Sequence, residues 1–163
     1  MFFLLGDRLS CTSAVKHTIH LEPGTVPINK RPYRLPESQR KETDRQVTNL
    51  LEDGIIGRRN SPWNVRYWWC PRGLARTESK KWRLLVDFRR LNEKRIGDAH
   101  SLPDIIEILG QLRQSKYFTC LDMVVGYHHI ELEEMEGPKT AFSTKQGNWE
   151  YRRLPFWDKS SAC

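Results

Sequence analysis

The sequence predicts an α+β fold in which helices are interspersed among mainly antiparallel strands. In two segments, 37–53 and 101–112, apolar residues recur at three- and four-residue steps, as in amphipathic helices. Between and after them lie short, aromatic-rich segments in which apolar and polar residues alternate, as in half-buried strands. No Gly-rich phosphate loop is present, so the sequence gives no support to a P-loop or dinucleotide-binding fold.

The charge distribution permits an anionic partner. A length of 163 residues suits one domain, and the formal net charge is +7. Residues 61–100 carry 10 basic and 4 acidic side chains, whereas residues 101–163 carry 7 basic and 9 acidic ones. A polymerase that binds nucleic acid through a basic lobe and metal ions through an acidic lobe would have this charge distribution. An ordinary solvated surface would have it equally well.

The spacing of the cysteines and the hydropathy of the N-terminus predict the cellular compartment of the chain. The four cysteines are scattered and form no C-x-x-C pair, which argues against a zinc site or a disulfide framework and fits a reducing compartment. The N-terminal "MFFLLG" is far shorter than a membrane span and has no basic n-region. We therefore expect an intracellular chain, cytoplasmic or nuclear, with no membrane partner.

The first helix follows an extended segment. Prolines at four positions within residues 1–36 disfavour a helix there and favour extended backbone. From Glu37 the pattern changes, and Val47, Leu50 and Leu51 form an apolar stripe among charged residues. Gly54 ends this helix, because glycine readily adopts the left-handed conformation of a helix C-terminus.

Two strands are predicted in the basic middle of the chain. The first, "VRYWWC" (65–70), is indicated by its aromatic content. In the second, "KWRLLVDF" (81–88), alternation places Arg83 and Asp87 on the polar face. An arginine on an exposed sheet face is often no more than a surface residue.

Further strands are predicted towards the C-terminus. The segment "HHIELEE" (128–134) alternates, so His128 and His129 would point to opposite faces and could not bind one metal ion. "KTAFST" and "WEYRRL" read as two strands joined across "KQGN", a Gly-Asn hairpin signal.

The segment 117–121 is an apolar run that ends on Asp122. Gly126 and Tyr127 follow within five residues. A strand that ends on an acid is either stopped by it in a turn or presents it to a ligand. Taken alone, Asp122 fits the turn better, and Tyr127 fits a core aromatic.

The order of the motifs changes this interpretation. Eight blocks occur collinearly: "PINKRPYRLP", "LLEDGII", "SPWN", "KWRLLVDFRRLNEK", "LPDIIEIL", "SKYFTCLDMVVGYHHIEL", "KTAFST" and "YRRLPF". Over about residues 15–156 the chain resembles the reverse transcriptase of gypsy-type long-terminal-repeat retrotransposons.

The resemblance implies a truncated fold: the fingers subdomain plus the first part of the palm. Residues 1–36 would be an extended segment leading in from the upstream Pol polyprotein, and 37–116 a fingers-like region. Residues 117–156 would form a partial palm with the first catalytic aspartate, and 157–163 a divergent tail. The chain would be a fragment of an RNA-directed DNA polymerase, with RNA/DNA primer-template, deoxynucleotides and the rest of the Pol polyprotein as partners.

The resemblance also assigns a catalytic and metal site. Asp122 matches the first catalytic carboxylate, and the Met123 carbonyl would add a second oxygen for Mg²⁺, a hard cation that prefers oxygen ligands. Arg83 matches the arginine that lies along the triphosphate, where its planar fork suits phosphate oxygens. Either Lys80 or Lys81 would supply a second cation.

The remaining matches concern the nucleotide. Tyr127 matches the aromatic that stacks under the sugar and excludes a 2′-hydroxyl. Val125 and Gly126 would line the same pocket through their backbone, and Gly126 allows close approach. Phe156 matches the position beside the incoming base.

The sequence departs from the family in ways that predict inactivity of this chain alone. It contains no Tyr-x-Asp-Asp motif, and one carboxylate cannot hold two magnesium ions. Glu133 and Glu134 are a poor substitute, because neighbours on a strand face opposite ways. Trp157 stands where the family has a small glycine. The alternatives are a catalytically dead nucleic-acid-binding remnant and a host-adopted interaction domain.

Overall fold

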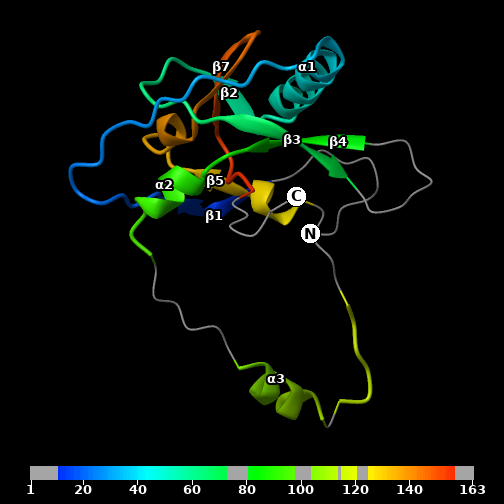
Figure 1. Cartoon of the computed structure of the whole chain (residues 1–163). Coiled ribbons are helices and arrows are strands. Elements are labelled where there is room, and N and C mark those ends of the chain that lie inside the picture. Colours follow the sequence, from blue (N-terminus) through cyan, green and yellow to red (C-terminus); the bar gives the residue numbers. More distant parts are fainter. Residues whose placement is uncertain (1–10, 73–80, 98–103, 114, 121–124, 157–163) are drawn as a thin grey trace.

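The computed structural model describes residues 11–72, 81–97, 104–113, 115–120 and 125–156, with an element order that mixes helices and strands. Figure 1 shows these elements gathered together except α3, which lies apart from the rest. In chain order they are β1 (Thr12–His17), α1 (Glu37–Glu52), β2 (Ile56–Arg58), β3 (Tyr67–Arg72), β4 (Lys81–Val86), α2 (Arg89–Glu93), α3 (Ile105–Leu112), the 3₁₀ helix η1 (Gly126–His129), β5 (Ile130–Leu132), the 3₁₀ helix η2 (Gly137–Thr140), β6 (Phe142–Thr144) and β7 (Gly147–Tyr151).

Helix α1 forms where the sequence predicts it and packs one side on the core. Val47 is buried and Leu50 packs against the core, as expected. Leu51 is instead exposed, because the buried side runs through Thr43, Val47 and Leu50 and leaves Leu51 at its edge. The helix stops before Gly54, which has a φ of +67°.

The strands of the described residues form three small sheets. The order β2-β7-β6 is antiparallel, with Ile56 opposite Tyr151 and Phe142 opposite Trp149. Strands β3 and β4 form an antiparallel pair, and β1 pairs with β5 in parallel. The prediction of mainly antiparallel strands is therefore confirmed. The division at residues 36, 116 and 156 stays a prediction.

The core centres on the predicted β6–β7 hairpin. Phe142 and Trp149 are buried, and the Phe142 ring lies 5.8 Å from that of Tyr151 and 6.3 Å from that of Tyr67. The Trp149 Nε1–H donates to Thr144 Oγ1 at 2.9 Å, which ties the hairpin together across its turn. The other buried apolar side chains are Ile19, Val47, Ile55, Ile56, Trp63, Val65, Phe88, Leu91, Leu132 and Ala141.

The predicted strand at 117–121 is not formed over its described part. Residues 117–120 have no strand conformation, and Tyr117 is 93% exposed. A strand needs a partner for its backbone hydrogen bonds, and among the described residues none pairs with this segment.

The predicted strand at 128–134 is shorter than expected. Val125 has a φ of +52°, and the chain then turns through η1, which contains His128 and His129. Only Ile130–Leu132 forms a strand. The expectation that the two histidines face opposite sides of a strand is therefore wrong.

Helix α3 forms as predicted, but its apolar side is uncovered. The Asp104 carboxylate caps it by accepting from the Ile106 N–H at 2.9 Å. None of its residues is buried, and Ile105 and Ile106 are both more than 70% exposed. Within the described part of the chain, the stripe thus has no core to face.

Two further features concern cysteines and helix length. Of the described cysteines, Cys11 and Cys120 are free, whereas Cys70 is disulfide-bonded, which the scattered spacing does not predict. Among the described residues, no helix combines the length and the apolar character that crossing a membrane requires.

Candidate nucleotide-binding site

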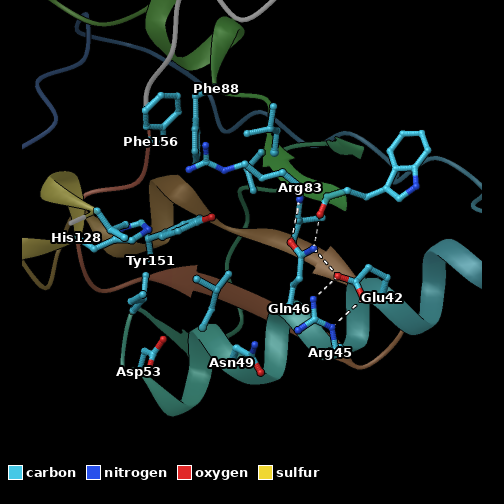
Figure 2. A pocket seen from close by; sticks show the side chains of 17 residues that line it. Glu42, Arg45, Gln46, Asn49, Asp53, Arg83, Phe88, His128, Tyr151 and Phe156 are labelled. Atoms are coloured by element: carbon cyan, nitrogen blue, oxygen red, sulfur yellow. Dashed lines mark hydrogen bonds and ion pairs between the residues drawn. The ribbon is translucent and has the colours of Figure 1, made fainter. Parts of the chain in front are cut away.

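A cavity of about 700 Å³ lies between helix α1 and strand β4. Figure 2 shows α1 side chains along one side of it and β4 residues opposite. Ile55, Phe88, Val125, His128, Tyr151 and Phe156 also contribute to the lining. The cavity therefore joins segments that lie more than 100 residues apart in sequence.

Two residues assigned to the nucleotide, Arg83 and Tyr127, both contact the ring of a third, Phe156. The Arg83 guanidinium carbon lies 5.1 Å from the centre of the Phe156 ring. The Tyr127 ring meets the same ring edge-on, at 5.0 Å and an interplanar angle of 84°. Val125 lines the cavity, whereas Gly126 and Tyr127 do not. Arg83, Tyr127 and Phe156 thus form one contiguous group.

Two titratable side chains, His128 and Tyr151, line the cavity together with Arg83 and are uncharged. Burial lowers the pKa of His128, a hydrogen bond between its Nδ1 and the Leu154 carbonyl opposes this at 3.0 Å, and nearby cations lower the pKa further. Burial raises the pKa of the Tyr151 hydroxyl well above its usual value. Both side chains are therefore neutral near pH 7.

Arg83 supplies positive charge beside these two side chains. Its side chain is exposed, and no carboxylate within the described residues forms an ion pair with it. An exposed guanidinium beside neutral side chains suits an anionic ligand such as a phosphate.

The α1 side of the cavity holds a polar group that the sequence motifs do not predict. The Gln46 amide contacts the backbone of β4, and Glu42 and Arg45 lie beside it (Figure 2). Hydrogen bonds from Arg45 and then Gln46 lower the pKa of Glu42 to about 2. A sequence signal exists, because Gln46 lies four residues before Leu50, on the side of the helix that faces inwards.

The predicted metal site falls outside what the structure describes. Asp122, Met123 and Lys80 lie outside the described residues, as do Trp157 and the side chain of Lys81. In the part of the chain that is described, no three histidine, cysteine, aspartate or glutamate side chains come together to hold a metal ion. The described residues alone therefore do not fit a two-metal centre.

Comparison with known proteins identifies the class. A family model described as reverse transcriptase (RNA-dependent DNA polymerase) matches residues 74–162, more than half of the chain. The chain belongs to this family.

Particular relatives agree with the resemblance to gypsy-type elements. The chain is 42% identical over 153 residues to the retrovirus-related Pol polyprotein from transposon opus of Drosophila melanogaster, covering 94% of this chain and 15% of the relative. It is 37% identical over 156 residues to that from transposon gypsy of the same species, covering 95% and 15%. The predicted membership of a retrotransposon reverse transcriptase is confirmed, and the chain spans about one seventh of the length of these relatives.

A solved structure supports the fold. The foamy viral protease-reverse transcriptase in complex with an RNA/DNA hybrid matches with a TM-score of 0.72 and 19% identity. The match covers 90% of this chain and 19% of that one. The predicted truncated reverse-transcriptase α+β fold is confirmed.

Proposed function

We propose that this chain is the nucleotide-binding part of an RNA-directed DNA polymerase from a retrotransposon Pol polyprotein. The observation that supports this most is that Arg83 and Phe156 meet in the cavity lining and that Tyr127 packs against Phe156. A cation, a ring for the base and a ring for the sugar are what a deoxynucleoside triphosphate requires.

Each residue has a distinct role in this proposal. Arg83 binds the triphosphate, and Lys80 or Lys81 adds a second cation. Phe156 lies beside the incoming base, and Tyr127 stacks under the sugar and rejects a 2′-hydroxyl. The backbone of Val125 and Gly126 borders the same position.

Catalysis in this proposal needs more than this chain. Asp122 and the Met123 carbonyl are the proposed oxygen ligands of Mg²⁺, whose charge would stabilise the reacting phosphate. A single carboxylate leaves that site incomplete. The chain alone would therefore bind a nucleotide without extending a primer, and the rest of the polyprotein would be its necessary partner.

A second candidate is a nucleic-acid-binding remnant without catalysis. Arginine–aromatic stacks favour it: the Arg66 guanidinium carbon lies 4.6 Å from the Tyr33 ring centre, and that of Arg89 lies 4.8 Å from the ring centre of Trp68. Arginines stacked on aromatic rings suit single-stranded nucleic acid, although Arg66 is half-buried and Arg89 is paired with Asp87. This candidate predicts strand binding without nucleotide incorporation in any context.

The test is a fusion. The C-terminal palm, thumb and connection of an active relative are joined after Phe156, and DNA synthesis is measured on a primed RNA template with Mg²⁺. The fusion should polymerise, and Asp122→Asn should lower its rate by roughly a thousandfold or more, because metal-based charge stabilisation is worth several kcal/mol.

Glu134→Gln is the matched control, because it removes an exposed carboxylate outside the cavity and should leave the rate unchanged. Synthesis that survives Asp122→Asn would make this aspartate a turn residue. A fusion that binds template but never incorporates a nucleotide would favour the second candidate.

A further inference from the structure

Among the described residues, strand β4 has one edge without a partner strand. It pairs with β3 only, in a two-stranded sheet in which Arg83 lies opposite Cys70. In a strand, the backbone groups of alternate residues face the same edge. The backbone groups of Trp82 and Leu84 therefore face the same edge as each other, on either side of Arg83.

The side chain of Gln46 occupies the edge opposite β3. Its Nε2 donates to the Trp82 carbonyl at 2.7 Å, and its Oε1 accepts from the Leu84 N–H at 3.0 Å. A primary amide carries the same donor and acceptor as a peptide group. Gln46 thus pairs with β4 as a residue of a neighbouring strand would (Figure 2).

The orientation of the Gln46 amide is fixed by a second partner. Its Nε2 also donates to Glu42 Oε1 at 2.8 Å. Glu42 is held in turn by Arg45, whose Nε lies 2.8 Å from Glu42 Oε2. Because Nε2 meets two acceptors while Oε1 meets a backbone N–H, the reversed orientation would lose all three hydrogen bonds.

We propose that Gln46 is a positioning residue for Arg83: its amide fixes the backbone on both sides of residue 83 and so aims the guanidinium over Phe156. The role in binding rests on the proposed nucleotide site. Arg83 is exposed and has no ion pair among the described residues to hold it. Apart from the contact with the Phe156 ring, its position therefore depends on the strand that carries it.

The test uses the full 163-residue chain and two measurements. The first is amide hydrogen exchange in residues 81–86, which reports on the strand without any nucleotide. The second is the affinity for a fluorescent deoxynucleoside triphosphate, with inorganic tripolyphosphate as competitor. Gln46→Met keeps the side-chain length and helix propensity but removes the hydrogen bonds.

Gln46→Met should speed exchange of the Leu84 amide and weaken nucleotide binding about 3- to 10-fold, as expected for the loss of hydrogen bonds that hold the site. Arg83→Ala should weaken binding by at least as much. In the Arg83→Ala background, Gln46→Met should have no further effect on affinity, because non-additivity identifies residues that act through one another.

Thr48→Ala is the control on the same helix, since Thr48 is exposed and donates only within α1, to the Asp44 carbonyl. If Gln46→Met unfolds the chain, Gln46→Glu serves instead. It keeps the acceptor for Leu84 but loses the donor to Trp82, so amide exchange in residues 81–86 should again be faster. Exchange is the readout for this variant, because a second carboxylate beside Glu42 would itself repel the triphosphate.

The outcomes separate the two proposals. If Arg83→Ala weakens binding and Gln46→Met does not, the positioning role is wrong and the nucleotide site stands. If Arg83→Ala has no effect, the proposed nucleotide site is wrong, and the binding role of Gln46 is overturned with it. Additive losses from Gln46→Met and Arg83→Ala would also overturn the positioning role.

Discussion

Phe156 offers the most direct test of the proposed nucleotide site. Phe156→Ala removes an edge-to-face contact with Tyr127, worth about 0.5–1.5 kcal/mol, and a cation–π contact with Arg83, worth about 0.5–1 kcal/mol. If both contacts serve to hold the site, up to about 1–2.5 kcal/mol of binding free energy is lost, a factor of roughly 5 to 70 in affinity. Titration of a fluorescent deoxynucleoside triphosphate measures this factor directly.

A substitution of Phe142, a core residue, distinguishes an effect on nucleotide binding from an effect on stability. Phe142 has no exposed surface, so Phe142→Leu should lower the free energy of unfolding by about 1–3 kcal/mol while leaving nucleotide affinity of the folded chain unchanged. Phe156 is only half-buried, so Phe156→Ala should cost less stability than a core truncation. Urea unfolding beside each titration gives both quantities. Nucleotide affinity that is the same for Phe156→Ala and the unchanged chain would refute the proposed site.

Three further predictions follow from charge, burial and shape. The pKa of buried His128 is lower in the folded than in the unfolded chain, so acidification protonates the unfolded chain first and stability falls as the pH drops below about 6.5. His128→Asn should reduce the loss in stability between pH 7.5 and 5.5, and an equal loss in both proteins would contradict this. Residues 61–100 should bind RNA or DNA through its phosphates, so the affinity measured by filter binding should fall steeply with added salt. An affinity that does not change with salt would show that this basic segment does not bind nucleic acid. In the active fusion, Tyr127→Ala should retain some synthesis and incorporate ribonucleotides, whereas continued rejection of them would remove the assigned role.

The elements predicted correctly are those fixed by local signals. Helix α1 has a clear apolar stripe and a glycine at its end, and the predicted β6–β7 hairpin forms, although its turn residues are Lys145 and Gln146 and the Gly-Asn pair begins β7. The segment 117–120 fails because a strand depends on a partner that no local pattern reveals. Helix α3 is predicted correctly as a helix, but its exposure depends on what the rest of the structure places against it.

In the candidate site, too, some residues are predicted from the sequence and others are not. The convergence of Arg83, Tyr127 and Phe156 follows from the order of the family's motifs, since composition and spacing do not bring segments so far apart together. Gln46 escaped prediction because a glutamine in a charged helix resembles a surface residue. Its place four residues before Leu50 shows only that it faces inwards, and its hydrogen bonds to the backbone of β4 show what it does there.

The parallel pairing of β1 with β5 has a consequence for the order of folding. His17 lies opposite Leu132, so more than 110 residues must be synthesised before the first strand can find its partner. The β3–β4 pair needs residues much closer in the chain and can form earlier. During translation, β1 would therefore leave the ribosome long before β5. Until β5 is synthesised, the backbone groups of β1 that pair with it would lack their partners. Chains released before residue 130 should be the ones that chaperones hold and proteases remove, because an unpaired strand edge is open to both.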